Sequence, residues 1–167
     1  MEASRIVHPL APIYDERSRV LVLGTMPSPK SREVGFYYGH PQNRFWKVLA
    51  ALFDEPEPCG NEERTAFLLA HRIALWDVLA SCTIVGASVA SIADPVPNDL
   101  RRVASVARLD AVFTTGTKAT TLYRRFGAPL LPEIPQCGLP STSPANARMR
   151  LEALVDAYRP LREALEG

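Results

Sequence analysis

Short runs of β-branched and aliphatic residues alternate with helical patterns along this chain, and that alternation most constrains its fold. The run RVLVLGT at 19–25 is apolar and ends in glycine, which predicts a buried strand. IALWDVLA at 73–80 and LDAVFTTG at 109–116 repeat the pattern, and a fourth strand is expected within EIPQCGLPSTSPAN at 133–146. Strands that alternate with helices indicate βαβ units and a mostly parallel sheet covered on both faces.

Apolar residues at helical spacing separate these strands. The predicted helices cover 43–53, 61–72, 97–107, 117–126 and 148–165, with capping residues expected at Asn43, at Asn61 and at Asn98 or Asp99. Two unusual loops, at 26–42 and 141–146, follow predicted strands. Since ligands of such sheets bind beyond the carboxyl ends of the strands, we expect both loops to border one cleft.

Composition narrows the class of protein further. With 167 residues, 47% apolar and 22% charged, the chain fits one globular domain over residues 1–167. A net charge of +1 gives no general argument for nucleic acid. Cys59, Cys82 and Cys137 lie far apart without C-x-x-C spacing, which argues against a disulfide framework, a zinc site or an iron–sulfur cluster. Without a signal pattern or a membrane-length apolar run, we expect a cytoplasmic monomer.

Two segments carry a resemblance to a known family. LGTMPSPKSREVGFYYGHPQNRFW at 23–46, together with LPSTSPANAR at 139–148, resembles the uracil-DNA glycosylase superfamily and within it most closely the hypoxanthine-DNA (deoxyinosine) glycosylases. The resemblance implies a three-layer α/β/α sandwich around a mainly parallel four-stranded sheet. It also implies a monofunctional DNA-repair glycosylase that acts on DNA containing a damaged base, with no metal and no cofactor. None of the three lysines, Lys30 included, is placed among the expected pocket residues as a Schiff-base nucleophile would be, which favours a hydrolase over a lyase.

A glycosylase of this kind flips a base out of the duplex and holds it by stacking and by hydrogen bonds to its polar edge. The resemblance places Tyr38 as the stacking ring, although an aromatic at the mouth of a loop also packs a core. Asn43, which opens NRFW, is the implied catalytic residue, and a helix cap is the competing interpretation. Met26 stands where mismatch-specific relatives carry a water-orienting asparagine, which argues against ordinary uracil excision.

The remaining base-binding candidates lie at strand ends. Gly24, Thr25, Met26 and Pro27 form the expected turn after the first strand, where backbone N–H groups can face a base. His40 is a candidate donor to the base or a phosphate, or a structural histidine. Asp77 ends the second strand, where a carboxylate can accept from N1–H of hypoxanthine; a capping or arginine-paired carboxylate is the alternative.

The second motif predicts contacts with the DNA backbone. Hydroxyl and N–H donors suit phosphate oxygens, and relatives often carry a bulky wedge in this loop. The DNA-binding candidates are Ser28, Lys30, Ser141, Thr142, Ser143, Arg148 and the small wedge Ala145 and Asn146. Two other functions stay open: excision chiefly of uracil or xanthine by the same fold, and DNA binding without turnover.

Overall fold

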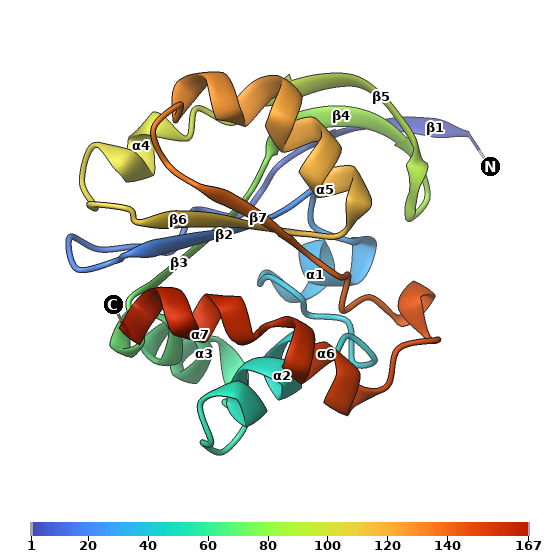
Figure 1. The fold of residues 1–167 in the computed structure, drawn as a ribbon. Helices are drawn as coiled ribbons and strands as arrows, with labels where there is room; N and C mark the ends of the chain where they lie inside the picture. The colour runs from blue at the N-terminus through green and yellow to red at the C-terminus, as the bar shows by residue number, and fades with distance from the viewer. Residues whose placement is uncertain (1, 167) are drawn as a thin grey trace.

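Four parallel strands form the central sheet of the computed structural model, which describes residues 2–166. The order is β3-β2-β6-β7, with β2 (Val20–Gly24) paired in parallel to β3 (Ile73–Asp77) and to β6 (Ala111–Thr115), and β6 paired to β7 (Gln136–Leu139) (Figure 1). Every residue of β2 and β3 is buried, as expected of strands covered on both faces. All four predicted strands are therefore present.

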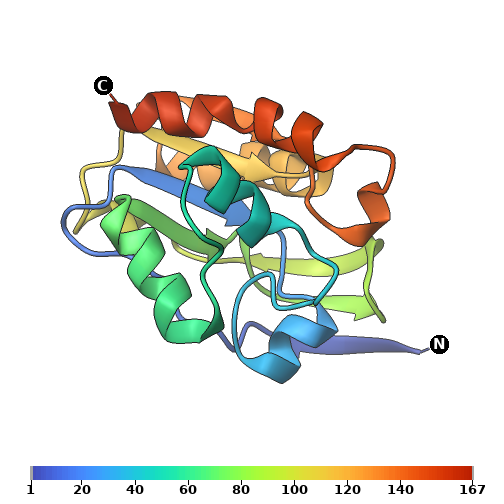
Figure 2. The same cartoon turned by 90° about the horizontal axis from the view of Figure 1, so that it is seen from below.

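Helices cover both faces of this sheet, which confirms the expected α/β/α arrangement. One layer holds α2 (Phe45–Leu52), α3 (Gly60–Ala70), α6 (Leu151–Ala157) and α7 (Arg159–Glu166), seen in front in Figure 2. On the other face lie α4 (Arg101–Ala104) and α5 (Thr117–Leu122), which continues as a π-helical turn (Figure 1). No helix within residues 2–166 is long and apolar enough to cross a membrane.

A second, antiparallel sheet was not predicted. It has the order β1-β4-β5, with β1 (Ala3–Val7), β4 (Leu79–Val85) and β5 (Ser88–Pro97). The run 73–80 that predicted one strand belongs to two, because β3 ends at Asp77 and the chain enters β4 at Leu79. Both β1 and β5 are largely exposed, so their sequences lack the apolar run that marks the central strands.

The loop predicted at 26–42 also contains a short helix, α1 (Pro29–Val34). Ser28 caps it by accepting from the backbone N–H of Ser31 at 3.1 Å, and Gly35 ends it in the left-handed conformation with φ +76°. Helix α3 begins earlier than predicted, with Cys59 rather than Asn61 at its cap. There the Glu63 carboxylate accepts from the Cys59 N–H at 2.6 Å.

Two buried tyrosines provide a matched test of how hydrogen bonding stabilises this fold. The Tyr158 hydroxyl donates to the Pro140 carbonyl at 2.7 Å, whereas the Tyr123 hydroxyl has no partner within the described residues. Tyr158→Phe should lower the free energy of unfolding by about 1 kcal/mol, because it leaves a carbonyl unpaired. Tyr123→Phe should cause no loss, because it removes an unpaired buried hydroxyl. Urea denaturation measures both, and equal losses would contradict the assignment.

Candidate active site

A cavity of about 320 Å³ opens at the carboxyl ends of β2, β3 and β6. The loop after β2, the loop after β7 and the β4–β5 hairpin all contribute to its wall. Of the residues predicted from the sequence, those lining it are Gly24, Thr25, Met26, Pro27, Ser28, Tyr38, His40, Asn43, Asp77, Ser141, Thr142 and Ser143. The two loops therefore border one cavity, as the topology predicted.

Asn43 presents only the nitrogen end of its side-chain amide to the cavity. Its Oδ1 accepts from the Phe45 backbone N–H at 2.9 Å and from the Thr142 hydroxyl at 2.7 Å. Since a backbone N–H can only donate, the oxygen must face Phe45, and both of its lone pairs are used. The Nδ2 group has no hydrogen-bond partner in residues 2–166 and remains a donor. The formal cap of α2 is Arg44, yet the Asn43 side chain satisfies the first helical N–H.

Tyr38 offers a ring held in a fixed position. It stacks on the fully buried Phe45 with ring centroids 3.8 Å apart and an interplanar angle of 14°, and its hydroxyl bonds the Thr115 hydroxyl at 2.9 Å. The opposite face of the ring is the one a ligand in the cavity can reach. Tyr38 also has a φ of +51°, which is costly for an aromatic residue and is typical of functional sites. Its neighbours Phe36 and Tyr37 belong to the core, and Tyr37 also lines the cavity.

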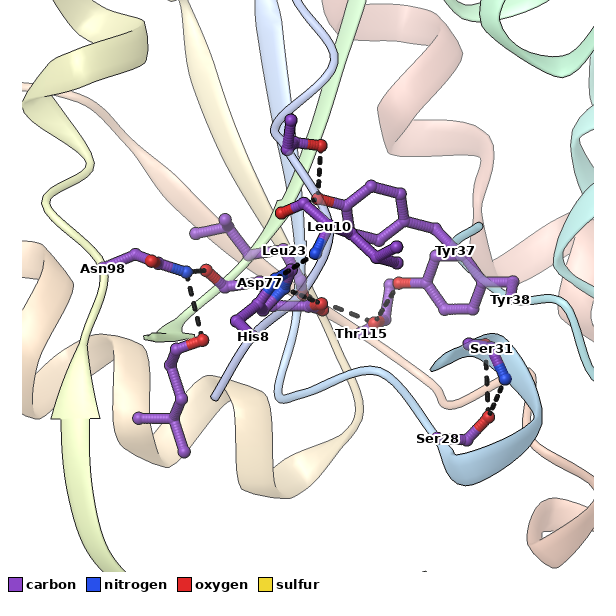
Figure 3. A network of polar contacts seen from close by, with 12 residues as sticks. His8, Leu10, Leu23, Ser28, Ser31, Tyr37, Tyr38, Asp77, Asn98 and Thr115 are labelled. Carbon is purple, nitrogen blue, oxygen red and sulfur yellow. Dashed lines mark hydrogen bonds and ion pairs between the residues drawn. The ribbon is translucent and has the colours of Figure 1, made fainter. Parts of the chain in front are cut away.

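Asp77 forms a buried pair with His8, a residue that sequence reasoning missed. The two side chains point toward one another in Figure 3, with His8 Nε2 2.8 Å from Asp77 Oδ2. The other carboxylate oxygen lies over Gly24, 2.5 Å from where a Cβ on that glycine would stand. Only a glycine at the end of β2 therefore permits this position of Asp77.

Several donors point to the same space. His40 Nδ1 accepts from the Gln42 N–H at 3.0 Å, so the proton of its neutral ring is on Nε2. Ser28, Ser141 and Ser143 each use the hydroxyl oxygen to accept a backbone N–H. Ser141 and Ser143 keep their hydroxyl protons for a ligand.

The predicted phosphate contacts divide into two groups. Thr142 is buried and its hydroxyl donates to Asn43 Oδ1, so this hydroxyl holds the amide. Lys30, Ala145, Asn146 and Arg148 lie outside the cavity wall. Lys30 pairs with Glu33 at 3.3 Å, and Asn146 Nδ2 donates to the Ser141 carbonyl at 2.8 Å. Ala145 and Arg148 are exposed.

Other cavity residues gave no signal in the sequence. Thr115 ends β6 and could have been inferred from strand order alone. Arg32 lies in the short helix that was predicted as loop, and its buried Nε has no partner within residues 2–166. The β4–β5 hairpin contributes Gly86, Ala87 and Val89 to the cavity wall, and only the tertiary structure brings it here. His8, which follows β1, does not line the cavity but bonds Asp77, which does.

Comparison with known proteins points to one family. The model of the uracil DNA glycosylase superfamily matches residues 11–165. A Methanosarcina acetivorans protein named hypoxanthine DNA glycosylase is 31% identical over 141 residues, which cover 81% of this chain and 85% of that protein. A Methanosarcina barkeri protein of the same name is 37% identical over 68 residues, 40% of this chain and 43% of that protein.

A solved structure agrees with the same fold. The solution NMR structure of a Methanosarcina acetivorans protein, provisionally described as a uracil DNA glycosylase, superposes with a TM-score of 0.74 at 28% identity. The match covers 93% of this chain and 98% of that one. It extends along nearly the whole chain.

The tyrosines of the cavity predict a loss of stability at alkaline pH. Burial raises the pKa of Tyr37 and Tyr38 above the ordinary value of 10.0, and the negative charge of Asp77 raises each further. A phenol whose pKa is raised by folding contributes stability that is complete below its unfolded pKa and is lost as the pH rises above it. We expect the free energy of unfolding, measured with urea, to fall above about pH 10. Tyr38→Phe should make that fall less steep, and an unchanged slope would contradict the assignment.

Proposed function

This chain belongs to the uracil-DNA glycosylase superfamily, and we propose that it is a monofunctional DNA glycosylase that releases hypoxanthine from deoxyinosine and leaves an abasic site. One observation carries the proposal. The cavity brings together a reachable aromatic face on Tyr38, an amide donor on Asn43 and a carboxylate oxygen on Asp77. A flipped base needs these three features: a stacking surface, a donor for its developing charge and a partner for its polar edge.

The Asp77 oxygen accounts for selection of a deaminated purine. Hypoxanthine carries N1–H beside its O6 carbonyl, whereas adenine carries an N1 lone pair in the same position. An oxygen that accepts from N1–H would repel that lone pair, so adenine in the cavity would leave two buried acceptors facing each other without a hydrogen bond. His40 Nε2–H and the backbone N–H groups of the turn after β2 can supply donors for O6.

The geometry of Asn43 favours a donor over a water-orienting acceptor. As the C1′–N9 bond breaks, its electron pair goes to the base and the sugar gains oxocarbenium character. The Nδ2 group can donate to the charge that develops on the base, while Oδ1 is already bonded twice. Water then bonds C1′ and releases a proton to solvent, and the base anion takes up a proton. Thr142 and Phe45 hold the amide in place throughout.

Uracil and xanthine are the second candidate substrates. Both carry an N–H between two ring carbonyl groups. An Asp77 oxygen can accept a hydrogen bond from this N–H as readily as from N1–H of hypoxanthine. The cavity therefore separates deaminated bases from adenine and cytosine more sharply than from one another. The further expectations, that one domain over residues 1–167 acts as a monomer in the cytoplasm and needs no metal or cofactor, stay predictions.

An incision assay tests the substrate. Labelled duplexes with a single deoxyinosine, deoxyuridine or deoxyxanthosine are incubated with the protein and then treated with alkali to break abasic sites. We expect alkali-dependent cleavage of the deoxyinosine strand. Cleavage chiefly of another strand would show that the base in that strand, and not hypoxanthine, is the preferred substrate. Binding without cleavage of any strand would support a DNA-binding protein without turnover.

Two substitutions of Asn43 separate its capping role from catalysis. Asn43→Asp keeps an oxygen to accept from Phe45 and Thr142 but replaces the Nδ2 donor, whereas Asn43→Ala removes both functions. Each should lower the single-turnover rate on deoxyinosine by about 10²-fold or more, as expected for loss of a donor to the transition state. Only Asn43→Ala should also cost about 1 kcal/mol of stability through the lost cap. Full activity of Asn43→Asp would exclude the donor role.

A further inference from the structure

We propose that His8 is a positioning residue that holds Asp77 by one carboxylate oxygen and so decides which oxygen of Asp77 meets the flipped base. This inference rests on the proposed function and adds to it the source of base selection. His8 lies at the end of β1, outside both loops that resemble glycosylase motifs. It directly follows strand β1 of the antiparallel sheet, and the catalytic geometry above gives it no role.

The hydrogen bonds of His8 determine its tautomer. The backbone N–H of Leu10 points to His8 Nδ1 at 3.1 Å, and since this group can only donate, Nδ1 must accept. The ring proton is therefore on Nε2, which donates to Asp77 Oδ2 at 2.8 Å (Figure 3). His8 acts here as a neutral donor. Such a donor stabilises the anionic carboxylate without adding a positive charge to the cavity.

The pair leaves one oxygen for the base. Side-chain exposure is 3% for His8 and 5% for Asp77, so water does not compete for their bond. With Oδ2 used by His8, Oδ1 lies over Gly24 and has no hydrogen-bond partner within residues 2–166. An anionic Oδ1 accepts from N1–H of hypoxanthine. A protonated Oδ1 would instead donate, and would suit the N1 lone pair of adenine. Because His8 Nε2–H donates to Oδ2, Oδ1 stays available to accept from the deaminated base.

The antiparallel sheet holds His8 at this point. Val7 pairs with Ser81 at the end of the β1–β4 ladder, and the His8 backbone N–H donates to the Ala80 carbonyl at 2.7 Å. Strand β4, which begins directly after β3, therefore positions His8, the residue that bonds Asp77 at the end of β3. The Tyr37 ring packs beside the imidazole with centroids 6.0 Å apart. These contacts fix the direction of the imidazole N–H.

Two substitutions of His8 test this role. His8→Gln places an amide donor near the position of Nε2, whereas His8→Leu keeps apolar volume and removes the donor. We expect His8→Leu to lower the single-turnover rate on deoxyinosine by about ten- to hundredfold, the range for a lost charge-assisted hydrogen bond. His8→Gln should restore most of that rate. A role in packing alone would make the two variants alike, and that result would overturn the proposal.

His71 provides a matched control. Its Nε2 lies 2.6 Å from Glu55 Oε2, and neither residue lines the cavity. His71→Leu therefore breaks a histidine–carboxylate pair elsewhere in the fold and should leave the rate on deoxyinosine unchanged. Urea denaturation of all variants identifies any loss that comes from unfolding. A rate loss in His71→Leu equal to that in His8→Leu would show that neither acts through the site.

A double-mutant cycle with Asp77→Asn shows whether His8 acts through Asp77. The readout is affinity for a duplex containing 2′-fluorinated deoxyinosine, because fluorine disfavours the sugar cation and slows hydrolysis. His8→Leu should weaken this binding in the wild-type background and add little in Asp77→Asn. Equal losses in both backgrounds would overturn the proposal. If the unmodified protein cleaves no deoxyinosine strand, the proposed function fails. If the unmodified protein cleaves this strand and His8→Leu cleaves it at the same rate, only this inference fails.

Discussion

The Asn43 carbonyl oxygen joins parts of the molecule that are far apart in sequence, and the geometry of the site depends on it. It accepts from Phe45 at the start of α2 and from Thr142 in the loop after β7. Arg44 extends the same connection, since its guanidinium donates to the Met149 and Asn146 carbonyls at 2.5 and 2.9 Å. The amide can point its donor at a ligand because these contacts oppose its rotation. The cap and the proposed catalytic group are thus two ends of one side chain.

The end of β2 sets a second constraint. Asp77 and Tyr38 both approach Gly24 so closely that a Cβ there would stand 2.5 Å from the carboxylate and 3.1 Å from the phenol. Glycine at this position allows Asp77, proposed to bond the polar edge of the base, and Tyr38, proposed to stack on it, to lie at the same strand end. Burial raises the pKa of Tyr38 and the negative charge of Asp77 raises it further, so the phenol stays neutral. A neutral ring is suited to stack on a base.

Sequence reasoning succeeded where local pattern and burial agree. Strands β2, β3 and β6 are fully or mostly apolar runs that end in or near a glycine or a polar residue, so their existence and order of appearance could be predicted. The antiparallel sheet could not, because β1 and β5 are exposed and alternate too weakly. For the same reason His8 was missed, since nothing near it in sequence marks it as the partner of Asp77. The bond between the Thr142 hydroxyl and Asn43 was not predicted, because side-chain direction is not encoded in loop composition.

The parallel α/β core, the two loops at its carboxyl edge and the residue types available there could all be predicted from the sequence. Those follow from periodicity, turn residues and motif spacing, which are local properties. The tertiary structure was needed to identify which part of each side chain is available to a ligand. These parts are Nδ2 of Asn43, Oδ1 of Asp77 and the ring face of Tyr38 opposite Phe45. The physical reason is that hydrogen bonding and burial are assigned by neighbours distant in sequence, and each bond made within the fold removes one that a ligand could use.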